Sequence, residues 1–194
     1  MNPLQYGRAI RPVTRPGPRL SAQIASLQDH RLGMSWSARD INAMLRSAGM
    51  RGFALVQARH GAPARFLGYV LFRTMADEGE ILSIAVQDGF RRRGIARTLL
   101  ERTLYFMNSK RVNTVFLEVS ETNRAAIAFY SRVGFEKFGT RHNYYTMNNR
   151  TIHNALVLRA EISRSLLRRI KAEKRSSGNS PSASGNYHRC WSRY

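Results

Sequence analysis

The sequence predicts a single α/β domain, and three features of its middle part lead to that prediction. Ile81 to Val86 is a continuous apolar run, which is typical of a strand buried on both faces. A helical pattern follows, with apolar residues at three- and four-residue spacing from Ile95 to Ser109. A second apolar run, Thr114 to Val119, comes next. The order strand–helix–strand predicts a right-handed crossover between neighbouring parallel strands.

The segment before this unit supplies one short strand and two helices. Ala9 to Thr14 is compatible with a strand that a Pro-Gly-Pro turn ends. Ser21 to His30 is a modest helix candidate. A second helix is expected from Ala38 to Ser47, because Ser37 is a good N-cap and Asp40 follows it three residues later.

Two strands then lead into the central unit. Gly52 to Ala58 and Phe66 to Thr74 are apolar segments separated by a turn at His60 to Pro63. Their closeness in sequence predicts an antiparallel hairpin.

A helix and two strands are expected after the central unit. Asn123 is placed to cap a helix from Arg124 to Arg132, which Gly134 closes. Phe135 to Thr140 and Ile152 to Arg159 are the last two predicted strands.

These elements define one domain with a tail on each side. Residues 1–8 are expected to be flexible, residues 9–162 to form the folded domain, and residues 163–194 to be a basic, largely disordered tail. Leu166, Leu167 and Ile170 are compatible with a basic helix that continues to about Lys174. Ser176 to Gly185 is rich in Ser, Gly, Asn and Pro and is expected to be disordered.

The formal net charge of +20 is the most unusual total of the chain. Between Ile162 and Tyr194, eight Lys and Arg residues stand against one acid, and between Met1 and Gln28 there are four arginines and no acid. Such a surface attracts polyanions, including RNA and the ribosome. The alternative, that the termini are solvated and only keep the protein soluble, stays open.

Cysteine content and hydropathy indicate a location. Cys190 is the single cysteine, so no intrachain disulfide can form, which suits a reducing cytoplasm. We expect no membrane contact, because no apolar run approaches the roughly 20 residues that span a bilayer and no signal peptide is evident.

The segment from Arg91 to Ala96 is the first candidate binding site. It lies between a predicted buried strand and the start of a helix, where unpaired amides and the helix dipole favour an anion. Gly94 lets the backbone approach a phosphate closely. The segment lacks the Gly-Lys-Ser/Thr of a P-loop and the three glycines of a dinucleotide fingerprint, so another phosphate carrier is expected.

The second candidate site pairs Glu118 with Tyr130. Glu118 interrupts an apolar strand, and a buried carboxylate is costly unless it is paired or functional. Tyr130 lies seven residues after Asn123, on a helix face that is expected to look toward the cleft beside Glu118. Two alternatives remain: Glu118 could pair with one of many arginines, and Tyr130 could be a core aromatic residue.

Other polar and aromatic residues are less informative. Asn143-Tyr144-Tyr145 could form an aromatic wall of a groove or a turn, and Trp36 is equally ambiguous. We expect no metal, because the histidines lack metal-ligand spacing; they are His30, His60, His142, His153 and His188.

These motifs together resemble the GNAT superfamily of N-acetyltransferases. The resemblance rests on IAV, then RRRGIA, then LEVS-x-x-N-x-x-A-x-x-F-Y-x-x-x-G-F, and it extends from about Ile10 to Arg159. Within the superfamily the chain is most similar to the bacterial ribosomal-protein-alanine N-acetyltransferases, the RimI type. The departures are Gln87-Asp88-Gly89 where the family has Asp-Pro, Ala96 where a glycine is usual, and the basic C-terminal tail, which the resemblance does not explain.

The resemblance implies a GNAT fold, with a central mixed, twisted β-sheet of about six to seven strands flanked by about four helices. It also implies acetyl-CoA as co-substrate. Glu118 would be the general base and Tyr130 the general acid. Asn123 would hold the pantetheine arm. The other cofactor-binding residues implied are Ile84, Ala85 and Val86 for the pantetheine and Arg91, Arg92, Arg93, Gly94, Ile95, Ala96 and Arg97 for the pyrophosphate.

The expected reaction is direct acetyl transfer to an amine, most simply the N-terminal α-amine of a protein such as a ribosomal protein. An α-amine has a pKa of about 7.7–8.0 and a lysine amine about 10.4, so the α-amine is neutral several-hundred-fold more often, by a rough estimate. Two alternatives stay open: a lysine or small-molecule amine as acceptor, and a non-catalytic RNA- or ribosome-associated protein with a vestigial acetyl-CoA site.

Overall fold

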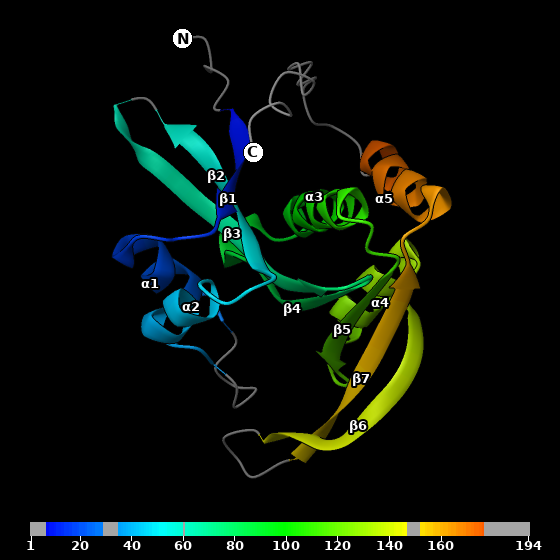
Figure 1. Cartoon of the computed structure of the whole chain (residues 1–194). Helices are drawn as coiled ribbons and strands as arrows, with labels where there is room; N and C mark the ends of the chain where they lie inside the picture. The colour runs from blue at the N-terminus through cyan, green and yellow to red at the C-terminus, as the bar shows by residue number, and fades with distance from the viewer. Residues whose placement is uncertain (1–6, 29–34, 60, 147–151, 177–194) are drawn as a thin grey trace.

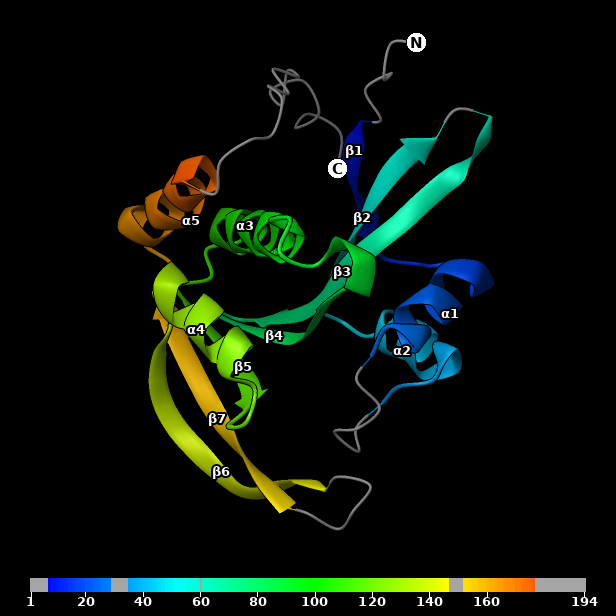
Figure 2. The ribbon, with the colours of Figure 1, turned by 180° about the vertical axis from the view of Figure 1, so that it is seen from behind.

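The computed structural model describes residues 7–28, 35–59, 61–146 and 152–176 of the chain. These residues form a mixed seven-stranded β-sheet with strand order β1-β2-β3-β4-β5-β7-β6, and five α-helices flank it (Figures 1 and 2). The predicted α/β class and the mixed sheet are confirmed.

The first four strands are antiparallel neighbours. They are β1 (Arg8–Val13), β2 (Met50–Arg59), β3 (Ala62–Met75) and β4 (Glu78–Val86). Two helices, α1 (Pro18–Ser26) and α2 (Ala38–Met44), join β1 to β2 and cover one face of these strands (Figure 1). The hairpin predicted from the sequence is therefore present as β2 and β3.

The second half of the chain adds three strands and three helices. They are α3 (Ile95–Ser109), β5 (Thr114–Ser120), α4 (Arg124–Val133), β6 (Glu136–Thr146), β7 (Ile152–Glu161) and α5 (Arg164–Ser176). β4 and β5 are parallel neighbours joined through α3, as the strand–helix–strand order predicts. β7 then pairs antiparallel to both β5 and β6.

Local sequence signals explain several helix ends. Ser37 and Asp40 form a capping box, in which the Ser37 hydroxyl accepts from the Asp40 amide at 3.2 Å and the Asp40 carboxylate accepts from the Ser37 amide at 2.9 Å. The Asn123 side chain accepts from the Ala126 amide at 3.1 Å and caps α4. Gly134 ends α4 at φ +115°, a left-handed conformation that favours glycine.

Two hydrophobic cores lie on opposite faces of the sheet. The smaller one joins α1 and α2 to β3 through residues such as Ile24, Ile41 and Tyr69. The larger one fills the space between the sheet and α3, α4 and α5. Apolar α3 residues at helical spacing are fully buried there; they include Leu99, Leu100, Leu104 and Met107.

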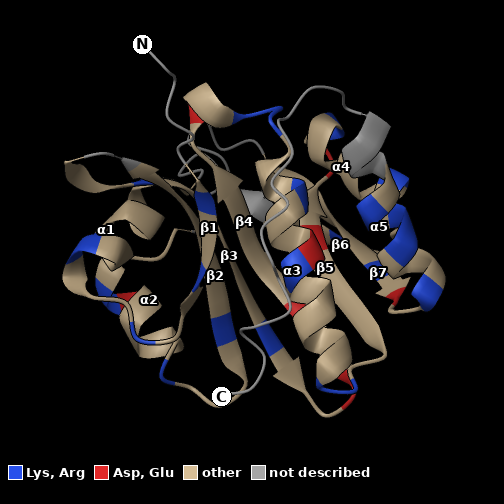
Figure 3. Cartoon of the chain, turned by 90° about the horizontal axis from the view of Figure 1, so that it is seen from above, with Lys and Arg blue, Asp and Glu red and all other residues tan. Residues whose placement is uncertain are grey.

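Helix α5 extends the packed part of the chain beyond the domain boundary that the sequence suggests at Ile162. Its Leu166, Leu167 and Ile170 are buried in the larger core. Arg164, Arg168, Arg169 and Lys171 are exposed, and Figure 3 shows basic residues in successive turns of the helix. The three apolar residues do form the helix that their spacing allows. The expectation of a largely disordered tail from residue 163 is wrong for Arg164–Ser176, because these residues find a partner surface on the domain. The expectation for residues 177–194 lies outside the described residues, as does that for residues 1–6.

No described helix is both long enough and apolar enough to cross a lipid bilayer.

We predict that Ile170→Ala lowers the free energy of unfolding of the whole domain by about 2–5 kcal/mol, the usual cost of such a core cavity. Ile170 has 0% relative exposure. Lys171→Ala is the matched control because Lys171 is exposed on the same turn, and it should change stability by less than about 0.5 kcal/mol. Urea unfolding measures both. Equal, small effects would show that α5 is not part of the cooperative unit.

Candidate active site

The parallel strands β4 and β5 separate partway along their length. Their pairing joins Glu78–Ile81 to Thr114–Leu117 and ends there. β4 continues along β3 as far as Val86, and β5 continues along β7 as far as Ser120. The pairing of β3 with β4 has a register shift between Leu71 and Phe72, next to Ile81, where the pairing with β5 ends. Such a bulge increases the local twist of the strands. The second halves of β4 and β5 are therefore not hydrogen-bonded to each other, and we call this break in the pairing the β4–β5 opening.

The second half of β4 is less buried than its apolar sequence suggests. The prediction of a strand buried on both faces is wrong for Leu82 to Ala85, which are half-buried. The physical reason is the loss of β5 as a neighbour after Ile81. The backbone edge of Ile84, Ala85 and Val86 that faces away from β3 can hydrogen-bond an extended ligand as an added strand would. The Val86 carbonyl also accepts from Arg91 Nε at 3.4 Å.

The loop after β4 exposes the first amides of α3. Gly94 is the N-cap residue at φ +74°, and a Cβ placed there would meet nothing within 4 Å. The first intrahelical bond runs from the Thr98 amide to the Gly94 carbonyl at 3.0 Å. The amides of Ile95, Ala96 and Arg97 precede that bond, so they point out of the helix start, where the dipole is positive. This geometry suits a phosphate group.

The arginine side chains of this loop mainly hold its shape. Arg91 forms an ion pair with Asp88 at 2.7 Å. The Arg93 guanidinium lies 5.3 Å from the centre of the Phe90 ring, which also contacts Arg65 at 4.5 Å. All three arginines, Arg91, Arg92 and Arg93, are nevertheless exposed, so their charge remains near the amides at the start of α3.

Arg97 reaches away from the loop. Its Nε donates to the Ile170 carbonyl at 2.6 Å, so this side chain fastens α5 to the first turn of α3. Arg97 belongs to the segment expected to wrap a pyrophosphate. Its backbone amide lies at the start of α3, whereas its side chain binds α5.

Glu118 lies on the sheet face opposite α3 and α4. Its neighbours Leu117 and Val119 are buried in the larger core, and the alternation of a strand turns Glu118 to the other side. The Glu118 side chain is 17% exposed and forms an ion pair with Arg141 Nε at 2.9 Å. The sequence interpretation that an arginine could pair with Glu118 is therefore correct for this structure.

Tyr144 completes a small cluster with Glu118 and Arg141. The Arg141 guanidinium lies 5.4 Å from the centre of the Tyr144 ring. Partial burial, followed by the hydrogen bond and the negative charge of Glu118, raises the pKa of Tyr144. The Tyr144 hydroxyl is the hydrogen-bond donor in this contact, because an ionised carboxylate can only accept.

A pocket of about 250 Å³ opens on this face and gathers negative charge. Glu78, Glu80 and Glu118 line it, which is three of the 12 acidic residues in a chain of net charge +20. Arg73 and Arg141 neutralise two of them, with Arg73 Nε 2.6 Å from Glu80. A formal charge of −1 therefore remains on the lining of this pocket, which we call the acidic pocket, and in a basic protein it favours a cationic amine as ligand.

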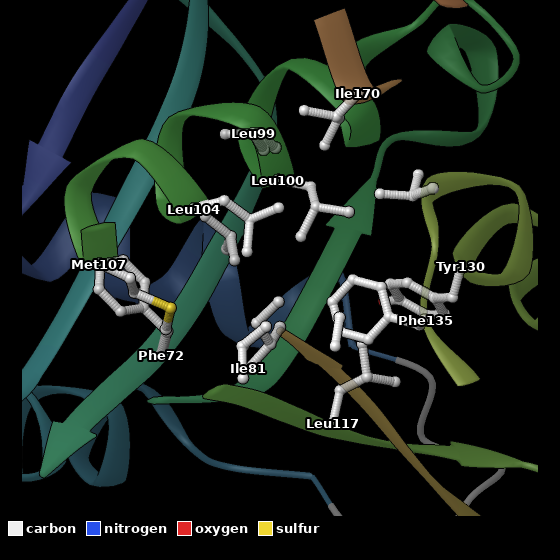
Figure 4. Packing of buried hydrophobic residues seen from close by; sticks show 14 of the residues in the cluster. Phe72, Ile81, Leu99, Leu100, Leu104, Met107, Leu117, Tyr130, Phe135 and Ile170 are labelled. Carbon is white, nitrogen blue, oxygen red and sulfur yellow. The ribbon is translucent and has the colours of Figure 1, made fainter. Parts of the chain in front are cut away.

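Tyr130 lies on the opposite face of β5 from Glu118. Its side chain is 5% exposed and packs beside Phe135, Leu117 and the α3 residues of the larger core (Figure 4). The Tyr130 and Phe135 rings meet edge to face at 5.5 Å. The two residues proposed from the sequence thus flank the β4–β5 opening from its two sides instead of facing each other across one cleft.

The remaining sequence candidates have structural roles. Asn123 uses its carbonyl oxygen to cap α4. The half-buried Trp36 packs on the smaller core. Its backbone N–H donates to Gln28 Oε1 at 2.8 Å, and its carbonyl accepts from Gln28 Nε2 at 2.9 Å. Asn143 has a left-handed backbone at φ +56°, and its backbone N–H donates to the side-chain oxygen of Asn154 at 3.1 Å. The side chain of Tyr145 lies outside the described residues, as do His30, His60 and His188.

Sequence reasoning missed Arg141 and Glu80. Arg141 is on β6, two strands away from Glu118, and its side chain reaches across β7. No local sequence pattern predicts the ion pair of Arg141 with Glu118, because it depends on the register of β6 on β7 and of β7 on β5.

Comparison with known proteins gives a family match and curated relatives. Residues 22–135 match the family model described as "Acetyltransferase (GNAT) family". The chain is 35% identical over 97 residues to the [ribosomal protein bS18]-alanine N-acetyltransferase of Salmonella typhimurium, and 35% identical over 81 residues to that of Escherichia coli. These alignments cover 50% and 42% of this chain, and 66% and 55% of the relatives. The chain therefore spans less than two thirds of either relative.

Solved structures share the fold. The E. coli ribosomal-protein-S18-alanine N-acetyltransferase superposes with a TM-score of 0.69 at 24% identity, covering 81% of this chain and 95% of that one. Arabidopsis thaliana NAA60 in complex with acetyl-CoA superposes with a TM-score of 0.67 at 19% identity, covering 80% and 99%.

We predict that Gly94→Ala weakens binding of coenzyme A about 5- to 30-fold, because a left-handed conformation costs an alanine about 1–2 kcal/mol. Gly89→Ala is the matched control: it lies in the same loop, has open space at its Cβ position and is not among the glycines of positive φ. Calorimetric titration with coenzyme A measures both variants. A similar affinity for the two would contradict the role of the Gly94 backbone.

Proposed function

The chain belongs to the acetyltransferase (GNAT) family, and from this premise we propose that it transfers acetyl from acetyl-CoA to the N-terminal α-amine of a protein. The proposed acceptor class is ribosomal proteins. The names of the curated relatives support that class, since both are ribosomal-protein bS18-alanine N-acetyltransferases.

The observation that carries the proposal is the arrangement of the β4–β5 opening. An amide loop lies at its end, Glu118 flanks one face of β5, and Tyr130 flanks the other. Direct acyl transfer needs such a two-sided site, because the amine must attack on one side while the thiolate leaves on another. Acetyl-CoA supplies the activated acetyl thioester.

This chain's residues fit the cofactor as follows. The amides of Ile95, Ala96 and Arg97 would bind the pyrophosphate, assisted by the charge of Arg91, Arg92 and Arg93 nearby. The open edge of β4 at Ile84, Ala85 and Val86 would pair with the amides of the pantetheine arm. Asn123, at the start of α4, retains its amide nitrogen for a polar group of that arm, since its oxygen caps the helix.

Glu118 is the proposed general base and Tyr130 the proposed general acid. The amine nitrogen forms a bond to the thioester carbon, and its proton passes to Glu118 directly or through a water. The carbon–sulfur bond then breaks, and the Tyr130 hydroxyl gives its proton to the departing thiolate. Arg141 must shift from its 2.9 Å ion pair so that the amine can reach Glu118.

The acidic pocket beside Glu118 supports an amine acceptor. An α-amine needs less help to lose its proton than a lysine amine, because its pKa is lower by about 2.5 units. A single carboxylate therefore suffices more easily for a protein N-terminus. We place the reaction in the cytoplasm, where ribosomal proteins are made.

We predict turnover with peptides that have a free N-terminal alanine or serine, and little or none with N-terminally blocked peptides that carry an internal lysine. Release of coenzyme A measures the rate. Turnover with the lysine peptides alone would reject the α-amine assignment, and no turnover with any amine would reject the enzyme itself.

We predict that Glu118→Gln and Tyr130→Phe each lower kcat about 100-fold or more while leaving acetyl-CoA affinity within about threefold, the behaviour of acid–base residues. Glu136→Gln and Tyr105→Phe are matched controls, because Glu136 is exposed and Tyr105 is half-buried away from the opening. Steady-state kinetics and cofactor titration measure the two effects. Loss of cofactor binding in either active-site variant would contradict its proposed role.

A further inference from the structure

Helix α5 presents two different faces. Leu166, Leu167 and Ile170 bury one face in the larger core, and Arg97 Nε fixes the Ile170 carbonyl at 2.6 Å. The N-terminus is also held, because the Ser163 hydroxyl accepts from the Leu166 amide at 3.1 Å. The orientation of the helix on the domain is therefore fixed by its buried side.

The other face of α5 carries exposed cations in a row. Arg164, Arg168 and Lys171 are all exposed and follow each other at four- and three-residue spacing. That spacing places them on one side of the helix, along about 10 Å of its axis. We call these three residues the basic stripe of α5.

Further arginines lie beside the basic stripe. Arg169 is exposed and its guanidinium lies against Gly134 at the end of α4, so that a Cβ built there would be 2.9 Å from Arg169 Nη1. Arg132, in the last turn of α4, is exposed as well. Between Arg164 and Ala172 the sequence has no acid. Figure 3 shows Lys and Arg in successive turns of α5.

We propose that the basic stripe of α5 is a docking surface for the phosphate backbone of an RNA strand. Regularly spaced cations on a rigid helix match the repeated negative charge of a nucleic acid, and guanidinium groups bind phosphate oxygens in pairs. The choice of RNA over DNA rests on the proposed function, because a ribosomal protein is assembled onto RNA.

The burial of α5 argues against an acidic membrane as the partner. A helix that lies in a membrane interface needs an exposed apolar face to insert beside its cations. The large apolar residues of α5 are Leu166, Leu167 and Ile170, and all three are already used in the core. Only electrostatic contact remains for its outward face.

The basic stripe also lies apart from the chemistry of the family. Glu118 lies on the face of the sheet opposite α3 and α4, whereas α5 packs in the larger core on the side of those two helices. RNA held at α5 would keep the enzyme near nascent or assembling ribosomal proteins without occupying the amine pocket on the opposite face of the sheet.

The test compares three full-length proteins: the natural one, Arg164→Gln/Arg168→Gln/Lys171→Gln, and a control with the same loss of charge. The control is Arg8→Gln/Arg11→Gln/Arg15→Gln, which changes exposed arginines on β1 and the turn after it. Substitution is preferable to deletion of α5, because deletion would uncover the core. Fluorescence anisotropy with a short, unstructured RNA measures affinity between about 50 and 200 mM salt.

We expect the α5 variant to bind RNA about tenfold or more weakly, and its logarithmic salt slope to fall by about 2, at roughly 0.7 for each lost contact. The control should lose less than about threefold. Peptide acetylation and thermal stability should be unchanged in both, which separates failure of this proposal from failure of the acetyltransferase assignment.

Equal RNA affinity of the α5 variant and the control would overturn the proposal. So would tighter binding of DNA of the same length, or binding of phosphatidylserine vesicles that is lost in the α5 variant while RNA binding is kept. A fall in coenzyme A affinity in the α5 variant would overturn it too, because the stripe would then belong to the cofactor site.

Discussion

The divergence of β4 and β5 after Ile81 and Leu117 is the constraint on which the rest of the site depends. While the two strands are paired, their backbones satisfy each other and leave no room for a ligand. Once they separate, β4 keeps an unpaired edge, and the loop that follows delivers the amides at the start of α3 to the same opening. Each half of the divided sheet is supported independently: β3 and the two small helices hold β4, and β7 holds β5. A cleft can therefore exist without loss of packing.

The division of the sheet also sets the chemistry. Strand alternation in β5 sends Leu117 and Val119 into the core that contains Tyr130 and sends Glu118 into the acidic pocket. Tyr130 and Glu118 thus occupy different environments, since Tyr130 packs among aromatic rings and Glu118 lies among charged side chains. Arg141 pairs with Glu118 at 2.9 Å, so the carboxylate is not left uncompensated in a partly buried position.

Local patterns predicted most of the fold. The sequence predicts α3 with its observed bounds, Ile95 to Ser109, because its apolar spacing is regular. The sequence also predicts the N-cap of α2 at Ser37 and the end of α4 at Gly134. Features that depend on distant pairing were not predicted: the half-exposed second part of β4, the placement of Tyr130 behind β5, and the reach of Arg141 across β7 all follow from strand register. The packing of α5 could not be predicted for a related reason. Its few apolar residues become part of a core only through contact with α3 and α4, which a local pattern does not show.

The Arg97 side chain connects helix α5 to the start of helix α3. The residue belongs to the first turn of α3, and its side chain holds the carbonyl of Ile170. Thermodynamic reciprocity then applies: whatever free energy the docking of α5 contributes to anion binding at the start of α3, anion binding returns to the docking of α5. The last described helix of the chain is thus anchored directly to the first turn of α3, so a change in the position of one is felt by the other.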